Sequence, residues 1–198
     1  MATNYLKHAV TGSVRKAQEH YYGSSARITG TPERDALTAD EVAFVQARDS
    51  FYLATVSEDG WPYLQHRGGL AGFLRVLNSQ TLAFADYRGN RQMLSTGNLA
   101  ANDRVALFLM DYPQRTRLKI LGHARIADAR QHPDIVKQLA EPDVHDSVER
   151  LCFIEVLSFD WNCPKYITPR FSAEEIQEWI GPLKQRIAEL EAKLKNQN

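Results

Sequence analysis

The chain has 198 residues, of which 43% are hydrophobic, and its 24 basic residues balance its 24 acidic ones. This length is enough for one domain with a substantial core, and the neutral balance excludes bulk electrostatics as a reason to bind nucleic acid or an anionic membrane. No apolar run is long enough to cross a bilayer, and two cysteines, Cys152 and Cys163, do not make a disulfide framework. We therefore expect a cytoplasmic protein that binds no nucleic acid and no membrane.

Residues 1–37 are mixed and polar, and we expect them to form an arm that packs on the main domain. The next residues, "TADE" at 38–41, match a capping box, in which Thr38 accepts a hydrogen bond from the backbone of Glu41 and the glutamate side chain reaches back. This pattern predicts a short helix that runs to about Ala47 and opens the main domain, which we expect to span 38–170.

Strand patterns dominate the main domain. Apolar, β-prone segments separated by short turns predict one hairpin over 51–69 and a second over 72–85. Two more strands are predicted at 104–110 and 117–128, and a last one at 150–160. The predicted fold class is therefore mainly β with added helices (α+β), built around a small antiparallel barrel.

Three further helices are expected. One covers 90–102 with Asn90 as its N-cap, and a short one begins at Pro133, where the missing N–H costs nothing. The third is a C-terminal helix over 171–198, which starts with a second capping box, "SAEE" at 172–175.

Apolar residues of this C-terminal helix recur at alternating spacings of four and three, which is a heptad seam. Gly181–Pro182 is expected to kink or restart the helix, and the two heptads beyond it suit packing on the helix's own domain or on a partner subunit. The seam residues are Ile176, Ile180, Leu183, Ile187, Leu190 and Leu194.

Common catalytic and cofactor motifs are missing from the sequence. It contains no P-loop, no G-x-G-x-x-G and no G-x-S-x-G, and its six histidines show no metal-ligand spacing. A nucleophile pair of His66 and Cys163 can be imagined, but nothing in the sequence places the two together. We therefore assign no catalytic residue and no metal ligand.

Three polar segments remain as candidate ligand sites. "DYRGNRQMLS" at 86–95 places Arg91 at a predicted helix start, where unpaired N–H groups attract phosphate, although the pattern equally fits a capped helix with solvated arginines. "QHRGG" at 65–69 puts Gln65 and Arg67 on one strand face, which suits either a ligand or an exposed edge. "DWNCPKYITPR" at 160–170 fits a ligand contact or a loop that packs Trp161 on the core.

Three stretches, taken in order, resemble the pyridoxamine 5′-phosphate oxidase-like flavin-binding proteins over about residues 40–165. They are "FYLATVSEDGWPYLQHRGG", "FADYRGNRQMLSTGNLAANDRVALFLMD" and "RLKILGHARI". The resemblance implies a six-stranded antiparallel split β-barrel of the FMN-binding type. It also implies a homodimer, with FMN bound in clefts at the subunit interface.

The same resemblance implies which residues bind FMN. Arg91 and Gln92 stand where the family has an Arg-Lys pair on the FMN phosphate, so one cation is lost, which Arg67, Arg88 or Arg117 could replace. Asn90 lies in the same turn. The remaining implied contacts are Gln65, His66, Arg67, Gly68 and Gly69 on one strand, Ala85 and Asp86 on another, Arg117 on a third, and Trp161, Asn162, Cys163 and Lys165 in the segment that reaches the flavin of the other subunit.

The function implied is an FMN-dependent oxidoreductase that acts on an undefined small molecule. The true oxidases of the family close with R-x-H-x-R, which grips the substrate phosphate, whereas this chain has "NCPKYITPR" at 162–170. A true pyridoxamine or pyridoxine 5′-phosphate oxidase and a non-enzymatic flavin-binding or redox-sensing module stay open as alternatives.

Overall fold

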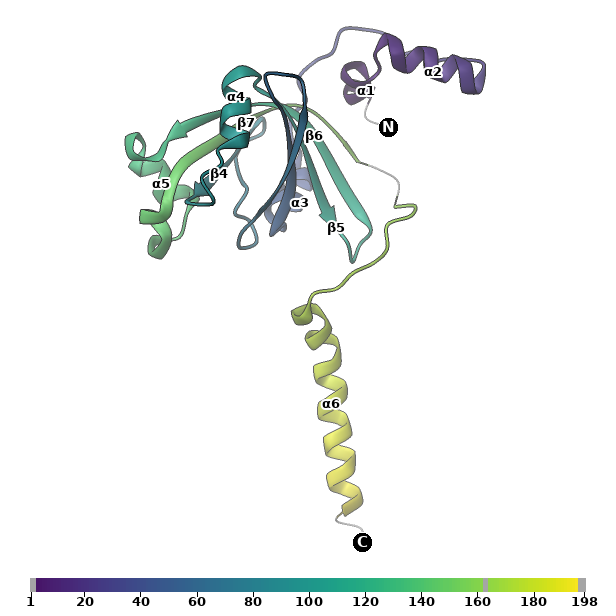
Figure 1. Ribbon diagram of the computed structural model, residues 1–198. Helices are drawn as coiled ribbons and strands as arrows, with labels where there is room; N and C mark the ends of the chain where they lie inside the picture. The colour runs from purple at the N-terminus through teal and green to yellow at the C-terminus, as the bar shows by residue number, and fades with distance from the viewer. Residues whose placement is uncertain (1–2, 162–163, 196–198) are drawn as a thin grey trace. The chain divides into compact units, whose positions relative to one another are not determined.

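The structure is a computed structural model that describes residues 3–161 and 164–195. The chain divides into two compact units, of which the larger comprises Met1–Met110 with Arg117–Cys163, and the smaller comprises Asp111–Thr116 with Pro164–Asn198. The larger unit holds the β-sheet, and the smaller holds a strand-connecting turn and the C-terminal helix (Figure 1).

Seven strands form one antiparallel sheet in the order β2-β1-β5-β6-β7-β4-β3 (Figure 1). The mainly-β class with added helices is thus confirmed, and the seven strands agree in number with the predicted segments. The resemblance implied six strands in a split barrel, whereas this sheet has seven strands and is open, with β2 and β3 as its edges. The strands are β1 (Ser50–Val56), β2 (Pro62–Gly68), β3 (Arg75–Asn78), β4 (Thr81–Tyr87), β5 (Arg104–Asp111), β6 (Thr116–Asp128) and β7 (Val148–Trp161).

Two buried apolar clusters explain which side chains of β1 and β4 are hydrophobic. Strand β1 alternates strictly, with Phe51 and Leu53 buried in the main core. Strand β4 is buried on both faces, because Leu82 and Phe84 enter that core while Ala83 packs in a second cluster under α5. The small alanine side chain on the second face lets the helix approach the sheet closely.

Within the larger unit, α3, α4 and α5 pack against strands of the sheet (Figure 1), and both predicted capping boxes are confirmed. The N–H of Thr38 donates to the Glu41 carboxylate at 2.8 Å, and Ser172 and Glu175 exchange hydrogen bonds of 2.7 and 3.1 Å. The arm also contains two helices that the sequence pattern did not predict, α1 and α2. The helices are α1 (Thr3–Ala9), α2 (Gly12–Tyr22), α3 (Ala39–Gln46), α4 (Leu94–Ala101), α5 (Pro133–Leu139) and α6 (Ala173–Lys195), with 3-10 turns at Ala129–Gln131 and Pro142–Ser147.

Two helix predictions need correction. Helix α4 begins at Leu94 instead of Asn90, because Arg91 and Met93 both adopt positive φ, at 60° and 58°, and so cannot continue a right-handed helix. Helix α6 runs unbroken through Pro182, so the expected restart there is wrong. A proline inside a helix removes one backbone hydrogen bond, which the surrounding turns tolerate here.

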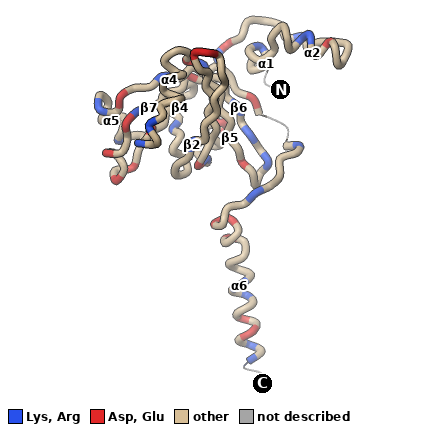
Figure 2. The backbone as a smooth tube through the Cα atoms, viewed as in Figure 1, with Lys and Arg blue, Asp and Glu red and all other residues tan. Residues whose placement is uncertain are grey.

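Charges of both signs are interspersed along the backbone, as Figure 2 shows, in line with the neutral composition. In the part of the chain that the structure describes, no helix is long and apolar enough to span a membrane.

Gly122 occupies a close approach between β6 and β7, beside a register shift at Leu121/Gly122. A Cβ atom at this position would lie 2.6 Å from the carbonyl oxygen of Glu155. We therefore expect Gly122→Ala to lower the free energy of unfolding by about 2 kcal/mol, measured by urea denaturation. Gly97→Ala is the control, because nothing lies within 4 Å of its Cβ and the alanine should stabilise α4 by about 0.5–1 kcal/mol. Equal effects of the two substitutions would contradict the close approach.

Candidate functional site

A polar pocket of about 210 Å³ lies where one face of β2, the end of β4, the loop 88–93 and the first turn of α4 meet. Six of the residues expected at the cofactor site line it together, although they are separated by up to 27 positions in sequence. Those six are Gln65, Arg67, Asp86, Asn90, Arg91 and Gln92, and the other lining residues are Tyr63, Tyr87, Gly89, Met93, Leu94, Ser95, Thr96 and Arg150.

Strand β2 supplies one wall of the pocket through simple alternation. Its odd-numbered side chains, Tyr63, Gln65 and Arg67, are half-buried on the pocket side, while the even-numbered ones are exposed. The Ser95 hydroxyl donates to Gln65 Oε1 at 2.7 Å, and this bond fixes the start of α4 against β2. Gln65 and Arg67 therefore share a face, as predicted from the strand pattern.

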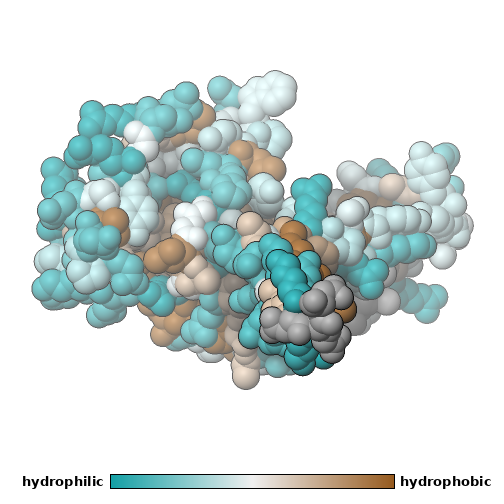
Figure 3. Space-filling model, turned by 90° about the horizontal axis from the view of Figure 1, so that it is seen from below, coloured by the Kyte–Doolittle hydropathy of each residue, from teal (hydrophilic) through white to brown (hydrophobic). Residues whose placement is uncertain are grey.

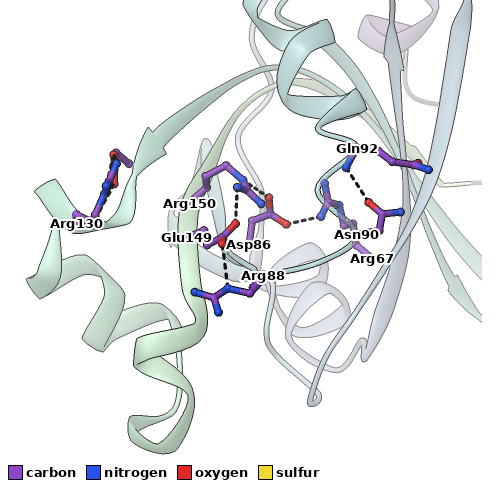
Figure 4. A network of polar contacts seen from close by, with 9 residues as sticks. Arg67, Asp86, Arg88, Asn90, Gln92, Arg130, Glu149 and Arg150 are labelled. Atoms are coloured by element: carbon purple, nitrogen blue, oxygen red, sulfur yellow. Dashed lines mark hydrogen bonds and ion pairs between the residues drawn. The ribbon is translucent and has the colours of Figure 1, made fainter.

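The loop 88–93 supplies a strained backbone. The N–H of Gln92 donates to Asn90 Oδ1 at 3.1 Å, which closes a local turn, so Asn90 shapes the loop and does not cap α4 (Figure 4). Arg91 and Met93, on either side of Gln92, both lie in the left-handed region, and left-handed residues are common in the backbone turns that bind anions through their N–H groups. Strain at non-glycine residues is concentrated at functional sites.

Asp86 lies between two arginines at the floor of the pocket (Figure 4). Arg67 Nη1 donates to Asp86 Oδ1 at 2.5 Å, and Arg150 Nε donates to Asp86 Oδ2 at 2.8 Å. Burial works against the charge on Arg150, but hydrogen bonds to Asp86 and to Glu149 outweigh it and raise the pKa of the guanidinium. The three side chains are only 10–17% exposed, so they form a partly buried ionic cluster.

The remaining donors fit a phosphate. Three arginines and one aspartate line the pocket, which leaves a formal charge of +2. Among the described residues, the exposed Arg91 guanidinium has no ion-pair partner, and the buried Nε of Arg67 has no hydrogen-bond partner. An unpaired buried donor and an unpaired cation beside a helix start are suited to a doubly charged phosphate monoester.

Other predicted cofactor residues lie beside this pocket. His66, Gly68 and Ala85 line a neighbouring pocket of about 190 Å³, which shares Arg67 and Asp86 with the first. Gly69 lines a third, more apolar pocket.

Arg88 and Arg117, two of the three arginines considered as a second cation, have other contacts. Arg88 pairs with Glu149 at 3.2 Å, and Arg117 lies over the Phe108 ring at 5.3 Å. Neither of them lines the pocket around Arg91. Of the three candidates, Arg67 is thus the arginine that shares a pocket with Arg91.

Trp161, the last residue of β7, does not line the pocket around Arg91. Trp161 packs its ring against Phe44 and donates its Nε1–H to Glu41 at 2.6 Å. Burial works to raise the pKa of the Glu41 carboxyl, but hydrogen bonds from Thr38 and Trp161 outweigh it and hold the pKa below its ordinary value. Lys165 lies over the Tyr166 ring, and the predicted residues Asn162 and Cys163 lie outside the described residues.

Several lining residues were missed by the sequence interpretation. Tyr63 follows from the same alternation that selected Gln65 and Arg67, so the signal was present. Ser95 and Thr96 follow only once the true start of α4 is known. Arg150 faces Asp86 because β7 pairs with β4 in a register that places these residues opposite each other, and no local pattern encodes that pairing.

Comparison with known proteins identifies one family. Residues 37–150, more than half of the chain, match the sequence model of the family described as pyridoxamine 5′-phosphate oxidase. No curated protein gives a significant match to the chain.

Solved structures are similar at low sequence identity. A variant of HupZ from Group A Streptococcus is 12% identical, with a TM-score of 0.50 over 64% of this chain and 99% of that one, which shows a shared fold. A putative pyridoxamine 5′-phosphate oxidase from Lactobacillus delbrueckii is 21% identical, with a TM-score of 0.49 over 63% of this chain and 93% of that one. A protein related to general stress protein 26, from Clostridium acetobutylicum, is 14% identical, with a TM-score of 0.47 over 69% and 94%.

The ionic cluster should stabilise the fold strongly. We expect Asp86→Asn to lower the free energy of unfolding by about 2–3 kcal/mol, because it leaves the Arg67 and Arg150 guanidinium groups partly buried without their carboxylate. Urea denaturation at neutral pH measures this change. Asp134→Asn is the matched control, since it removes an exposed pair with Lys137 and an exposed first-turn charge of α5, and should change stability far less. A loss no larger than the control's would show that the cluster does not hold the strands together.

Proposed function

The chain belongs to the pyridoxamine 5′-phosphate oxidase family, and we propose that it is an FMN-binding flavoprotein that transfers electrons to or from a small molecule. The observation that carries this proposal is the pocket that joins Arg91, the strained loop 88–93, the first turn of α4 and the unpartnered Nε of Arg67. Each of these groups has a donor that could bind an anion, and together they would complement the charge of the FMN phosphate.

Different residues would contact different parts of the cofactor. Arg91 and the loop amides would hold the phosphate, with Arg67 as the second cation in place of the lysine that Gln92 replaces. The face of β2 with Gln65, and the neighbouring pocket with His66 and Ala85, would contact the ribityl chain and the ring. When bound, the flavin supplies the redox chemistry, while the protein orients it and sets the charges around it.

We also propose that two copies share the cofactor site. The pocket of about 210 Å³ is smaller than the roughly 300–1,000 Å³ typical of small-molecule sites, so one chain supplies only part of an FMN site. The outer face of the β1–β2 hairpin carries the exposed side chains of Trp61 and Leu64, which suit contact with a second copy. On this interpretation the curved sheet corresponds to the family's split barrel, with β3 as an added edge strand. A strictly monomeric protein that binds FMN tightly would refute the shared site.

Two alternatives are separated by simple measurements. Turnover of pyridoxamine 5′-phosphate by the loaded protein would establish a true oxidase, although the R-x-H-x-R motif is missing from the sequence. A flavin that no nicotinamide donor reduces and no small substrate reoxidises would indicate a sensing or storage module. The visible spectrum of the purified protein, with mass identification of the released cofactor, distinguishes a flavin from haem or deazaflavin.

Arg91 is the residue that tests the phosphate site. We expect Arg91→Ala to weaken FMN binding by about 1.5–3 kcal/mol, roughly 10- to 150-fold, because a charge-assisted contact to the phosphate is lost. Fluorescence titration of the apoprotein with FMN measures the change. Arg88→Ala is the matched control, since Arg88 lies three residues away but pairs with Glu149 and does not line the pocket. Unchanged affinity in Arg91→Ala would remove Arg91 from the site.

Gln92 gives a test of opposite sign. We expect Gln92→Lys to tighten FMN binding by about 0.5–1.5 kcal/mol, because it restores the cation that the family has beside the phosphate. The same titration, repeated at high salt, should shrink this gain because salt screens exposed charges. A weaker complex in Gln92→Lys would show that the side chain at 92 does not face the phosphate.

A further inference from the structure

Helix α6 carries a continuous row of uncovered apolar side chains. The six residues of its heptad seam are 37–63% exposed, far more than is usual for large apolar groups on one face of a helix. Brown apolar groups remain visible on the molecular face that Figure 3 shows. Since α6 is unbroken from Ala173 to Lys195, the seam extends over three heptads, and not over the two that lie beyond Pro182.

The types of residue in the central two heptads of the seam favour a two-stranded parallel coiled coil. Taking Ile180 as position a, these heptads have Ile180 and Ile187 at a with Leu183 and Leu190 at d, while the outer seam positions are Ile176 at d and Leu194 at a. β-Branched isoleucine at a with leucine at d favours parallel pairs of helices. Pro182 falls at position c, on the side away from the seam, where its ring does not obstruct a partner helix.

The flanking charges select the orientation of the partner. In a parallel pair, position g of one helix faces position e of the following heptad in its partner, which places Arg186 beside Glu191 of the second copy. In a fully overlapped antiparallel pair, Arg186 would instead approach Arg186 of the second copy, and Lys184 would approach Lys184 of the second copy. Both contacts bring like charges together and are repulsive. Figure 2 shows charges of both signs along the same helix.

Arg186 has an additional partner within its own helix. Its Nη1 donates to Glu189 Oε2 at 3.1 Å. A guanidinium carries five donors in a planar fork, so the contact to Glu189 leaves donors available for a carboxylate on another helix.

We propose that α6 is a dimerisation helix that pairs in parallel and in register with α6 of a second copy of this chain. The apolar seam is the contact surface, and the Arg186–Glu191 pairs set its direction. This interface is formed by α6 alone and does not depend on the flavin or on the proposed contact between the sheets.

Site-specific disulfide formation tests the pairing in the full chain. In a Cys163→Ser background, where the remaining Cys152 is 1% exposed, Leu190→Cys places a thiol at a seam position that faces its own copy. We expect it to cross-link under mild oxidation at least about tenfold faster than Ala192→Cys at outward position f, because only Cα atoms within about 7 Å can be bridged. Denaturing gel electrophoresis without reductant measures both rates.

Each outcome of the cross-linking either supports or overturns the parallel pairing of α6. Fast self-linking at 190 supports the parallel pair. Linking only in a mixture of Ile180→Cys and Leu190→Cys chains would show an antiparallel pair and overturn the proposal. Equal rates at 190 and 192 would show that the seam is covered by something other than its own copy.

A charge reversal gives an independent readout. Glu191→Lys should slow the cross-link at 190 by bringing like charges together, and the added substitution Arg186→Glu should restore it. At protein concentrations high enough for the sheet contact to form without α6, the absorbance of bound cofactor should stay the same in all these variants, so a failure of this proposal is distinguishable from a failure of FMN binding. No rescue by the double substitution would overturn the charge pairing.

Discussion

The bond between Arg67 and Asp86 is the constraint on which the architecture of the site depends. Strand β2 is one edge of the open sheet, and β4 lies next to the other edge, so no backbone ladder joins them. Arg67 Nη1 and Asp86 Oδ1 are nevertheless only 2.5 Å apart, and Arg150 binds the second oxygen of the same carboxylate. Side chains therefore bring together two regions of the sheet that its hydrogen bonds leave apart.

This bridge explains why a pocket forms at that place. Where neighbouring strands pair, the side chains of the two strands fill the space between them, whereas an unpaired junction leaves room for a ligand. The start of α4 covers the junction from one side and is held there by the bond from Ser95 to Gln65. Asp86 also neutralises part of the positive charge, so Arg91, which has no partner among the described residues, is the cation with most freedom to bind an anion.

The sequence predicted those parts of the site that depend on local rules. Alternation along β2 placed Gln65 and Arg67 on one face, and the capping boxes located the starts of α3 and α6. The start of α4 was wrong by four residues because Asn90 is a good N-cap by type, while the positive φ of Arg91 and Met93 is imposed by the surrounding fold. Such backbone strain leaves no mark in the residue types.

Arg150 illustrates the second limit of local patterns. It lies opposite Asp86 only because β4 and β7, which are 64 positions apart at these residues, pair in one register, and a shift of one residue would turn the arginine to the other face. The open order of the sheet is likewise a property of long-range pairing, so the strand segments could be located while their arrangement could not.

Two separate surfaces of this chain are suited to self-association, and their physics differs. The sheet face around Trp61 and Leu64 offers two exposed apolar side chains without a directional element, whereas the α6 seam combines apolar layers with charges that distinguish parallel from antiparallel partners. Three heptads form a short coiled coil, whose stability alone is modest. If both surfaces join the same two copies, each makes the other contact intramolecular and raises its effective concentration. A shared cofactor cleft would then stay assembled at protein concentrations at which either surface by itself would dissociate.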